Sequence, residues 1–231
     1  MSLLLLEWKL LTRNKRLKQQ FILILLFFPF IVYVQLATNS LVQDFFLLKE
    51  LFLFLLFLLP VYNSSLVVFG VNATFIEKQV TTPLSIYQII KAKYRFYCIE
   101  SFLLFIISLP SLFIGVNIFE ITAAFLFAVG FMYFSLFMIS LISYKPFDVK
   151  SSTFYNFQGI DAGSYIYTIL VYVVAFGFMM LFYLFCNETV ALIAMSVLGL
   201  VFIATNRIWL GFIARRFEKT KHYRLERFNE K

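Results

Sequence analysis

The sequence predicts an all-α integral membrane protein with six transmembrane helices and both termini in the cytoplasm. Of its 231 residues, 62% are hydrophobic and only 14% are charged, whereas a soluble domain is about 45–50% apolar and about 25% charged. Six apolar runs approach or reach the length of a membrane-spanning helix, about 20 residues. The Lys and Arg residues lie between these runs, almost all on one expected side. Lipid rather than water is therefore the expected surrounding of most of the chain.

The six expected spans fix the domain organisation and the orientation. In chain order they cover residues 21–37, 51–69, 96–116, 121–142, 165–185 and 190–208. With the N-terminus inside, all but one of the 20 Lys and Arg residues lie in the cytoplasm, as is usual for membrane proteins, and Lys49 is the exception. We expect one domain over residues 1–231: an interfacial helix at 1–20, a six-span bundle at 21–211 and a basic cytoplasmic tail at 212–231.

Residues 2–20 predict an amphipathic helix in the headgroup layer. Four leucines share one face of this helix and three cations occupy the neighbouring face: Leu3, Leu6, Leu10 and Leu17, and Lys9, Arg13 and Arg16. Leucine and Trp8 beside cations are typical of a helix that lies in the membrane interface. A simple extension of the first span is the alternative. The basic tail, with seven cations between residues 215 and 231, is expected to contact anionic lipid.

The loop between the second and third spans predicts two helices separated by Pro83. Thr74 and Glu77 have the spacing of a capping box, which begins the first helix, and Pro83 ends it by about residue 82. Ser85 and Gln88 repeat the spacing and begin a second helix that continues into the third span. A short cytoplasmic helix across the ends of two spans would allow a bound partner protein to move those spans. An ordinary solvated connector is the alternative.

The order of Glu77, Pro83 and Lys91 before a span resembles the coupling-helix loop of type-two ABC exporter permeases. The chain is similar to that family also in length, span number, cytoplasmic termini and cationic N-terminal segment. It departs from the family where Lys78 follows Glu77 in place of the usual Gly, and where only residues 186–189 separate the last two spans. Members of that family often have re-entrant helices inserted between the fifth and sixth spans.

The resemblance implies a permease subunit of an ATP-driven exporter in the plasma (inner) membrane of a bacterium. Its partners would be an ATP-binding cassette ATPase, which binds ATP and Mg²⁺, and a second permease subunit in a homodimer or heterodimer. No cofactor is expected on this chain. The implied contact with the ATPase is made by a single segment and the proline after it: Thr74, Phe75, Ile76, Glu77, Lys78, Gln79, Val80 and Pro83.

Polar residues within the spans are the candidates for the substrate path. The resemblance places this path on the second and fifth spans, at Asn63, Ser64, Ser65, Tyr165, Thr168 and Tyr172. Hydrogen bonds between helices and a belt of interfacial tyrosines are the alternatives. Glu100 is an intramembrane charge about one turn into the third span, where a carboxylate is costly and usually paired or functional. We expect it to pair with Lys93 or Arg95, and a proton relay is the alternative.

Motifs for catalysis, metals and nucleic acid do not support those functions. The chain has no phosphate-binding loop, no G-x-S-x-G and no H-E-x-x-H motif. His222 is the only histidine, and one histidine does not make a metal site. Cys98 is expected near the cytoplasmic end of the third span and Cys186 near the outer end of the fifth span, which is too far apart for a disulfide, so both are expected to be free thiols. The net charge of +8 follows the membrane topology and does not predict a nucleic-acid partner. We therefore expect no enzyme activity and no metal site.

Two other functions stay open. The first is the substrate-binding membrane subunit of a vitamin importer, a class that typically carries Ala-x-x-x-Ala on its first span. Here that spacing occurs at Ala124 and Ala128 of the fourth span. The second is a membrane scaffold without a role in transport.

Overall fold

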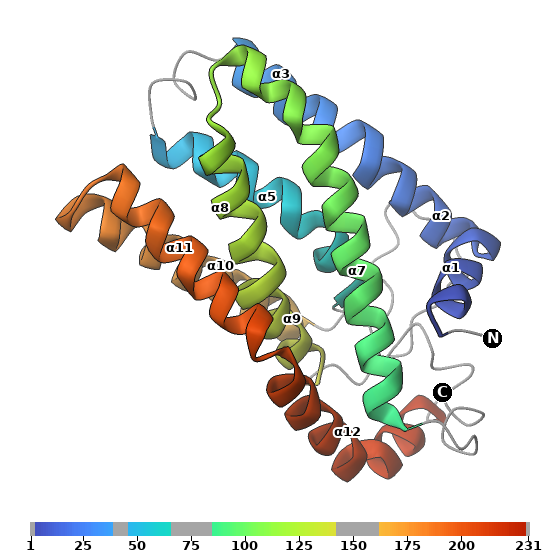
Figure 1. Ribbon diagram of the computed structural model, residues 1–231. Coiled ribbons are helices and arrows are strands. Elements are labelled where there is room, and N and C mark those ends of the chain that lie inside the picture. Colours follow the sequence, from blue (N-terminus) through green and yellow to red (C-terminus); the bar gives the residue numbers. More distant parts are fainter. Residues whose placement is uncertain (1–2, 39–45, 66–84, 142–161, 230–231) are drawn as a thin grey trace.

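A computed structural model of the chain describes residues 3–38, 46–65, 85–141 and 162–229, which are almost entirely helical and contain no strand (Figure 1). The α-helices are α1 (Leu3–Arg13), α2 (Lys15–Ile22), α3 (Phe28–Thr38), α5 (Phe46–Ser65), α7 (Ile86–Ser108), α8 (Ile118–Phe127), α9 (Tyr133–Ser140), α10 (Ala162–Phe185), α11 (Glu188–Ala204) and α12 (Asn206–Asn229). Shorter π-helical and 3₁₀ segments join several of them: η1 (Leu23–Phe27), η3 (Leu109–Ile114) and η4 (Ala128–Met132).

Three stretches of the described residues are long and apolar enough to cross a membrane: Leu17–Thr38, Ile86–Ile114 and Ile118–Ser140. A fourth is added if α11 and α12, which are bent by 61° relative to each other, count as one span. These four overlap four of the expected spans, and α5 and α10 occupy the positions of the other two. The all-α fold is thus confirmed, while six spans and cytoplasmic termini stay predictions.

The outward faces of these helices carry large apolar side chains. Phe113 is 93% exposed, Phe185 is 81% exposed and Ile208 is 74% exposed. Monomeric soluble proteins rarely expose wide apolar surfaces. Such faces are suited to contact with lipid.

The helices form a layered bundle around an aromatic core (Figure 1). The first-span helices α2 and α3 and then α7 lie along one edge, α10 and α11 lie along the other, and α5, α8 and α9 lie between them. The rings of Tyr133, Phe127 and Phe137 are fully buried in the middle. Trp209 of α12 packs edge-on against Tyr94 of α7, with ring centroids 5.1 Å apart.

Helix α7 begins where the sequence predicts. The Ser85 Oγ accepts a hydrogen bond from the Gln88 backbone amide, and the Gln88 Oε1 accepts one from the Ser85 amide, both at 3.3 Å. This is the expected capping box. At its other end the chain turns through Gly115, whose φ of 88° is accessible to glycine at little cost, and Asn117 and Glu120 form a second capping box that begins α8.

Two expected boundaries differ from the structure. The N-terminal helix ends at Arg13 rather than near residue 20, and at this break the Asn14 side chain donates a hydrogen bond to the Leu10 carbonyl at 2.6 Å. Residues 15–20 instead begin the helix of the first span. At the C-terminal end, the bundle core extends beyond residue 211, since Ile213 and Phe217 of α12 are buried in it.

Candidate functional site

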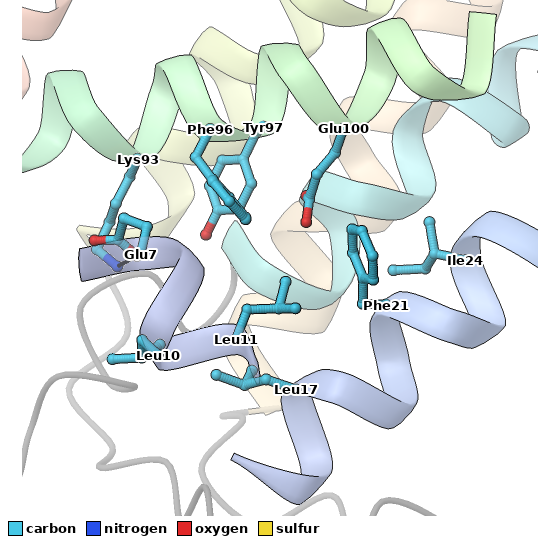
Figure 2. A pocket seen from close by; sticks show the side chains of 10 residues that line it. All are labelled: Glu7, Leu10, Leu11, Leu17, Phe21, Ile24, Lys93, Phe96, Tyr97 and Glu100. Atoms are coloured by element: carbon cyan, nitrogen blue, oxygen red, sulfur yellow. Dashed lines mark hydrogen bonds and ion pairs between the residues drawn. The ribbon is translucent and has the colours of Figure 1, made fainter. Parts of the chain in front are cut away.

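A buried ion pair joins α1 to α7. The Lys93 Nζ lies 3.1 Å from the Glu7 Oε2, and the two side chains are only 3% and 15% exposed. Figure 2 shows Glu7 reaching from α1 to Lys93 on α7. Burial removes the Lys93 ammonium almost completely from water and leaves the Glu7 carboxylate only limited access to it, so each charge is stabilised by the other. We call the contact between these two helices the α1–α7 seam.

Apolar contacts bring α1 into this position. The ring of Trp8 packs edge-on against Phe21 of α2, with centroids 6.1 Å apart. Leu11 is 8% exposed and belongs to the main core, although it lies outside the expected leucine face. Because α1 folds back after Asn14, it contacts both α2 and α7. It is therefore packed on the bundle and does not extend the first span.

A small cavity of about 40 Å³ lies along the seam, lined by Glu7, Lys93 and Glu100 together with apolar side chains. About 10–15 Å³ is enough to hold one water molecule. In Figure 2 Glu100 points from α7 toward Phe21 and Ile24 of the first-span helix. The cavity therefore gathers two acidic side chains and one basic side chain next to an apolar helix interface.

Glu100 is buried, with 6% of its surface exposed, but it does not pair as the sequence suggests. Lys93 bonds to Glu7 instead, and Arg95 is exposed. Within the described part of the chain, Glu100 makes no hydrogen bond or ion pair. Its carboxyl group borders both the small cavity and a larger apolar hollow of about 280 Å³.

Hydroxyl groups on the other side of α7 are satisfied within the core. The hydroxyl of Tyr133 shares a hydrogen bond with the Ser101 Oγ and donates to the Tyr97 carbonyl at 3.3 Å. The Tyr94 hydroxyl donates to the Val129 carbonyl at 3.4 Å. These bonds hold α7 against η4 and α9.

A second polar cluster lies at the opposite ends of the helices, where the sequence predicts the outer side. The Lys49 Nζ lies 2.6 Å from the Glu120 Oε1, and the Glu120 Oε2 accepts from the Asn117 amide at 3.0 Å. Glu50 is fully buried, and neither of its carboxyl oxygens has a hydrogen-bond partner. No group of three or more His, Cys, Asp or Glu side chains among the described residues is arranged to hold a metal ion.

The other candidate residues from the sequence are only partly placed. The expected ATPase contact, from Thr74 to Val80 and Pro83, lies outside the described residues. Asn63, Ser64 and Ser65 end α5, and Tyr165 and Thr168 lie near the start of α10, but their side chains are outside the description. Tyr172 is half-buried and packs against the main core. The substrate path therefore stays a prediction.

Glu7 is the site residue that sequence reasoning missed. It is the only acidic residue before Asp44, in a segment otherwise rich in cations and leucine. A single acid in such a segment is the signal that could have indicated a partner outside α1. The Lys49–Glu120 pair carried a similar signal, because Lys49 is the one cation on the expected outer side.

Comparison with known proteins gives a family but no activity. Neither a curated protein nor a solved structure matches the chain. One family matches over residues 1–231, and it is described as a family of unknown function. The chain therefore belongs to the DUF5687 family.

Proposed function

We propose that this chain is the membrane-spanning permease subunit of an ATP-driven exporter of the type-two ABC family. A separate ATPase subunit would bind ATP and Mg²⁺, and a second permease subunit would complete the translocation path. The observation that carries the proposal is the attachment of α1 to the first half of α7 through Glu7 and Lys93.

The position of this attachment suits transmission of movement. Helix α7 begins at Ile86, with Ser85 as its N-cap, directly after the segment that contains Glu77 and Pro83. A force on that segment would act on the first turns of α7 and, through the buried ion pair, on α1 at the same time. Closure of the ATPase subunits would thus tilt α5 and α7 together with α1, and a change in the access of a central site would follow.

The importer alternative rests on span number and compactness, and the alanine spacing typical of its first span falls here in the fourth expected span. Ala124 and Ala128 are both fully buried in the core of the chain itself. They therefore offer no surface to a partner subunit. The scaffold alternative is separated from transport by the following experiment.

The test is recovery of partners from native membranes with the tagged full chain, identified by mass spectrometry. We expect an ATP-binding cassette ATPase with the wild type and its loss with Glu77→Arg, because the charge reversal falls on the proposed contact. Glu188→Arg is the matched control: it makes the same change on an exposed residue at the start of α11, on the expected outer side. Unchanged recovery with Glu77→Arg, or no ATPase with the wild type, would contradict the proposal.

A further inference from the structure

Glu100 lies at the boundary between two hollows of the α1–α7 seam. One is the small cavity that contains the Glu7–Lys93 pair, and the other is the apolar hollow of about 280 Å³, which we call the apolar groove. Glu100 is only 6% exposed, and its carboxyl group has no hydrogen-bond or ion-pair partner among the described residues. A buried carboxylate without a partner is costly, so a ligand that brings a positive charge to this point is favoured.

The apolar groove has the size and lining for an aliphatic chain. Its walls are Leu4, Leu5 and Trp8 of α1, and Ile99 and Leu103 of α7. Trp8 and Ile99 are about half exposed, at 47% and 51%, so the groove opens toward the expected lipid. Its volume exceeds the roughly 150 Å³ of an apolar cavity that is large enough to bind benzene. An aliphatic chain could therefore enter from the membrane.

The charges of the seam select the head group of such a ligand. Lys93 is already neutralised by Glu7 at 3.1 Å. The acidic and basic side chains that line the two hollows are Glu7, Lys93 and Glu100, which leave one net negative charge when ionised. A phosphate or carboxylate head group in the apolar groove would meet the unpaired carboxylate of Glu100 and no unpaired cation. An ammonium group would instead complete the charge balance at Glu100.

We propose that the apolar groove binds a single-chain cationic amphiphile. Its ammonium group pairs with Glu100, and its aliphatic chain lies between Trp8 and Leu103. A phospholipid fits less well, because its phosphate would lie next to the unpaired carboxylate of Glu100. This binding site belongs to the chain itself and does not depend on the proposed coupling to an ATPase.

Trp8 provides a direct reporter, because it lines the groove and is one of only two tryptophans in the chain. The full chain is placed in phosphatidylcholine nanodiscs, and ω-bromododecyl trimethylammonium is added as a quencher of tryptophan fluorescence. We expect saturable quenching that is absent from Trp8→Phe, since Trp209 is buried against Tyr94 in the core. ω-Bromododecanol and ω-bromododecanoate have the same chain length and test the head group.

Glu100→Gln keeps the shape of the side chain and removes its charge. We expect it to weaken binding of the ammonium probe at least about tenfold and to leave binding of the alcohol probe unchanged. Glu218→Gln makes the same change on an exposed carboxylate of α12 and should not alter either value. Thermal unfolding of each variant verifies that it is folded.

Three results would overturn the proposal. They are equal binding of the ammonium and alcohol probes by the wild type, wild-type affinity in a folded Glu100→Gln variant, and loss of probe binding in nanodiscs of phosphatidylethanolamine. The last result would assign the groove to a bilayer lipid. The comparison of the three probes uses the wild-type protein alone, so it decides the question even if Glu100→Gln does not fold.

Discussion

At the scale of single residues, the Glu7–Lys93 pair is the contact that most directly fixes α1. It joins positions 86 residues apart in the chain, and neither side chain has much access to water. Removing one partner of a buried pair leaves an uncompensated charge, which costs about 3–5 kcal/mol. The two partners are not equivalent, because Lys93 is 3% exposed and Glu7 is 15% exposed.

We predict that Glu7→Gln lowers the thermal unfolding midpoint more than Lys93→Met does. The first change leaves the deeply buried ammonium of Lys93 alone, whereas the second leaves a carboxylate that still reaches water. A loss of at least about 5 °C is expected for Glu7→Gln. The measurement is unfolding of the purified chain in one detergent. The exchanged pair Glu7→Lys with Lys93→Glu should recover part of the loss, and no recovery would show that charge pairing is not what holds α1.

The partner of Lys93 shows where sequence reasoning reaches its limit at this scale. Helical periodicity puts Lys93 and Glu100 near one face of α7, and both do line the same cavity. Which acid Lys93 meets depends on how α1 folds back across α7 after Asn14. Spacing within one helix does not contain that information. The burial of Glu100 was therefore predictable and its lack of a partner was not.

At the scale of helices, the backbone of α11 makes a direct contact with the end of α8 and with the η4 segment that follows it. A Cβ on Gly130 would overlap the carbonyl of Gly199, and a Cβ on Gly199 would overlap the carbonyl of Leu126. The backbones therefore meet directly, as small residues allow between helices in membranes. No rule of local sequence pairs these two glycines, because the contact depends on how distant helices cross.

We predict that Gly199→Ala strongly destabilises the fold, since the overlap is with backbone atoms that cannot rotate away. Gly177→Ala is the matched control: it lies within α10 and a Cβ there meets no atom within 4 Å. Alanine is favoured over glycine inside a helix by about 0.5–1 kcal/mol, so the control should be neutral or slightly stabilising. Unfolding midpoints and yields of folded protein compare the two variants. Equal midpoints would mean that Gly199 of α11 is not in backbone contact with the end of α8.

The bend between α11 and α12 is another feature of this scale that hydropathy alone does not show. The last carbonyls of α11 are occupied by side chains: the Thr205 hydroxyl donates to Val201, and the Trp209 Nε1 donates to Phe202 at 2.8 Å. The apolar run from 190 to 208 reads as one straight span. In the structure it is a helix over Glu188–Ala204 followed by a change of direction of 61°. Polar residues near the end of an apolar run, such as Thr205, can therefore indicate that the helix ends or bends there.

At the scale of the whole molecule, the sequence predicts the positions of the helices better than their arrangement. Each expected span overlaps a helix, because apolar composition over a run of residues is a local property. The packing of α1 across α7 and of α12 beneath the bundle depends on long-range contacts. The orientation in the membrane depends neither on local composition nor on packing. It is predicted from the segregation of Lys and Arg, and an experiment in a membrane tests it.

The two cysteines allow that experiment without adding any reporter. Both are free thiols; Cys186 is exposed at the turn between α10 and α11, and Cys98 is half-buried in α7. If both termini are cytoplasmic, Cys186 lies on the outer side. We predict that a membrane-impermeant maleimide labels intact cells that carry the wild type or Cys98→Ser, and does not label Cys186→Ser. Labelling of Cys186 only after the cells are opened would reverse the orientation. It would then move the α1–α7 seam to the outer side, away from any cytoplasmic ATPase, so this single measurement also bears on the proposed coupling.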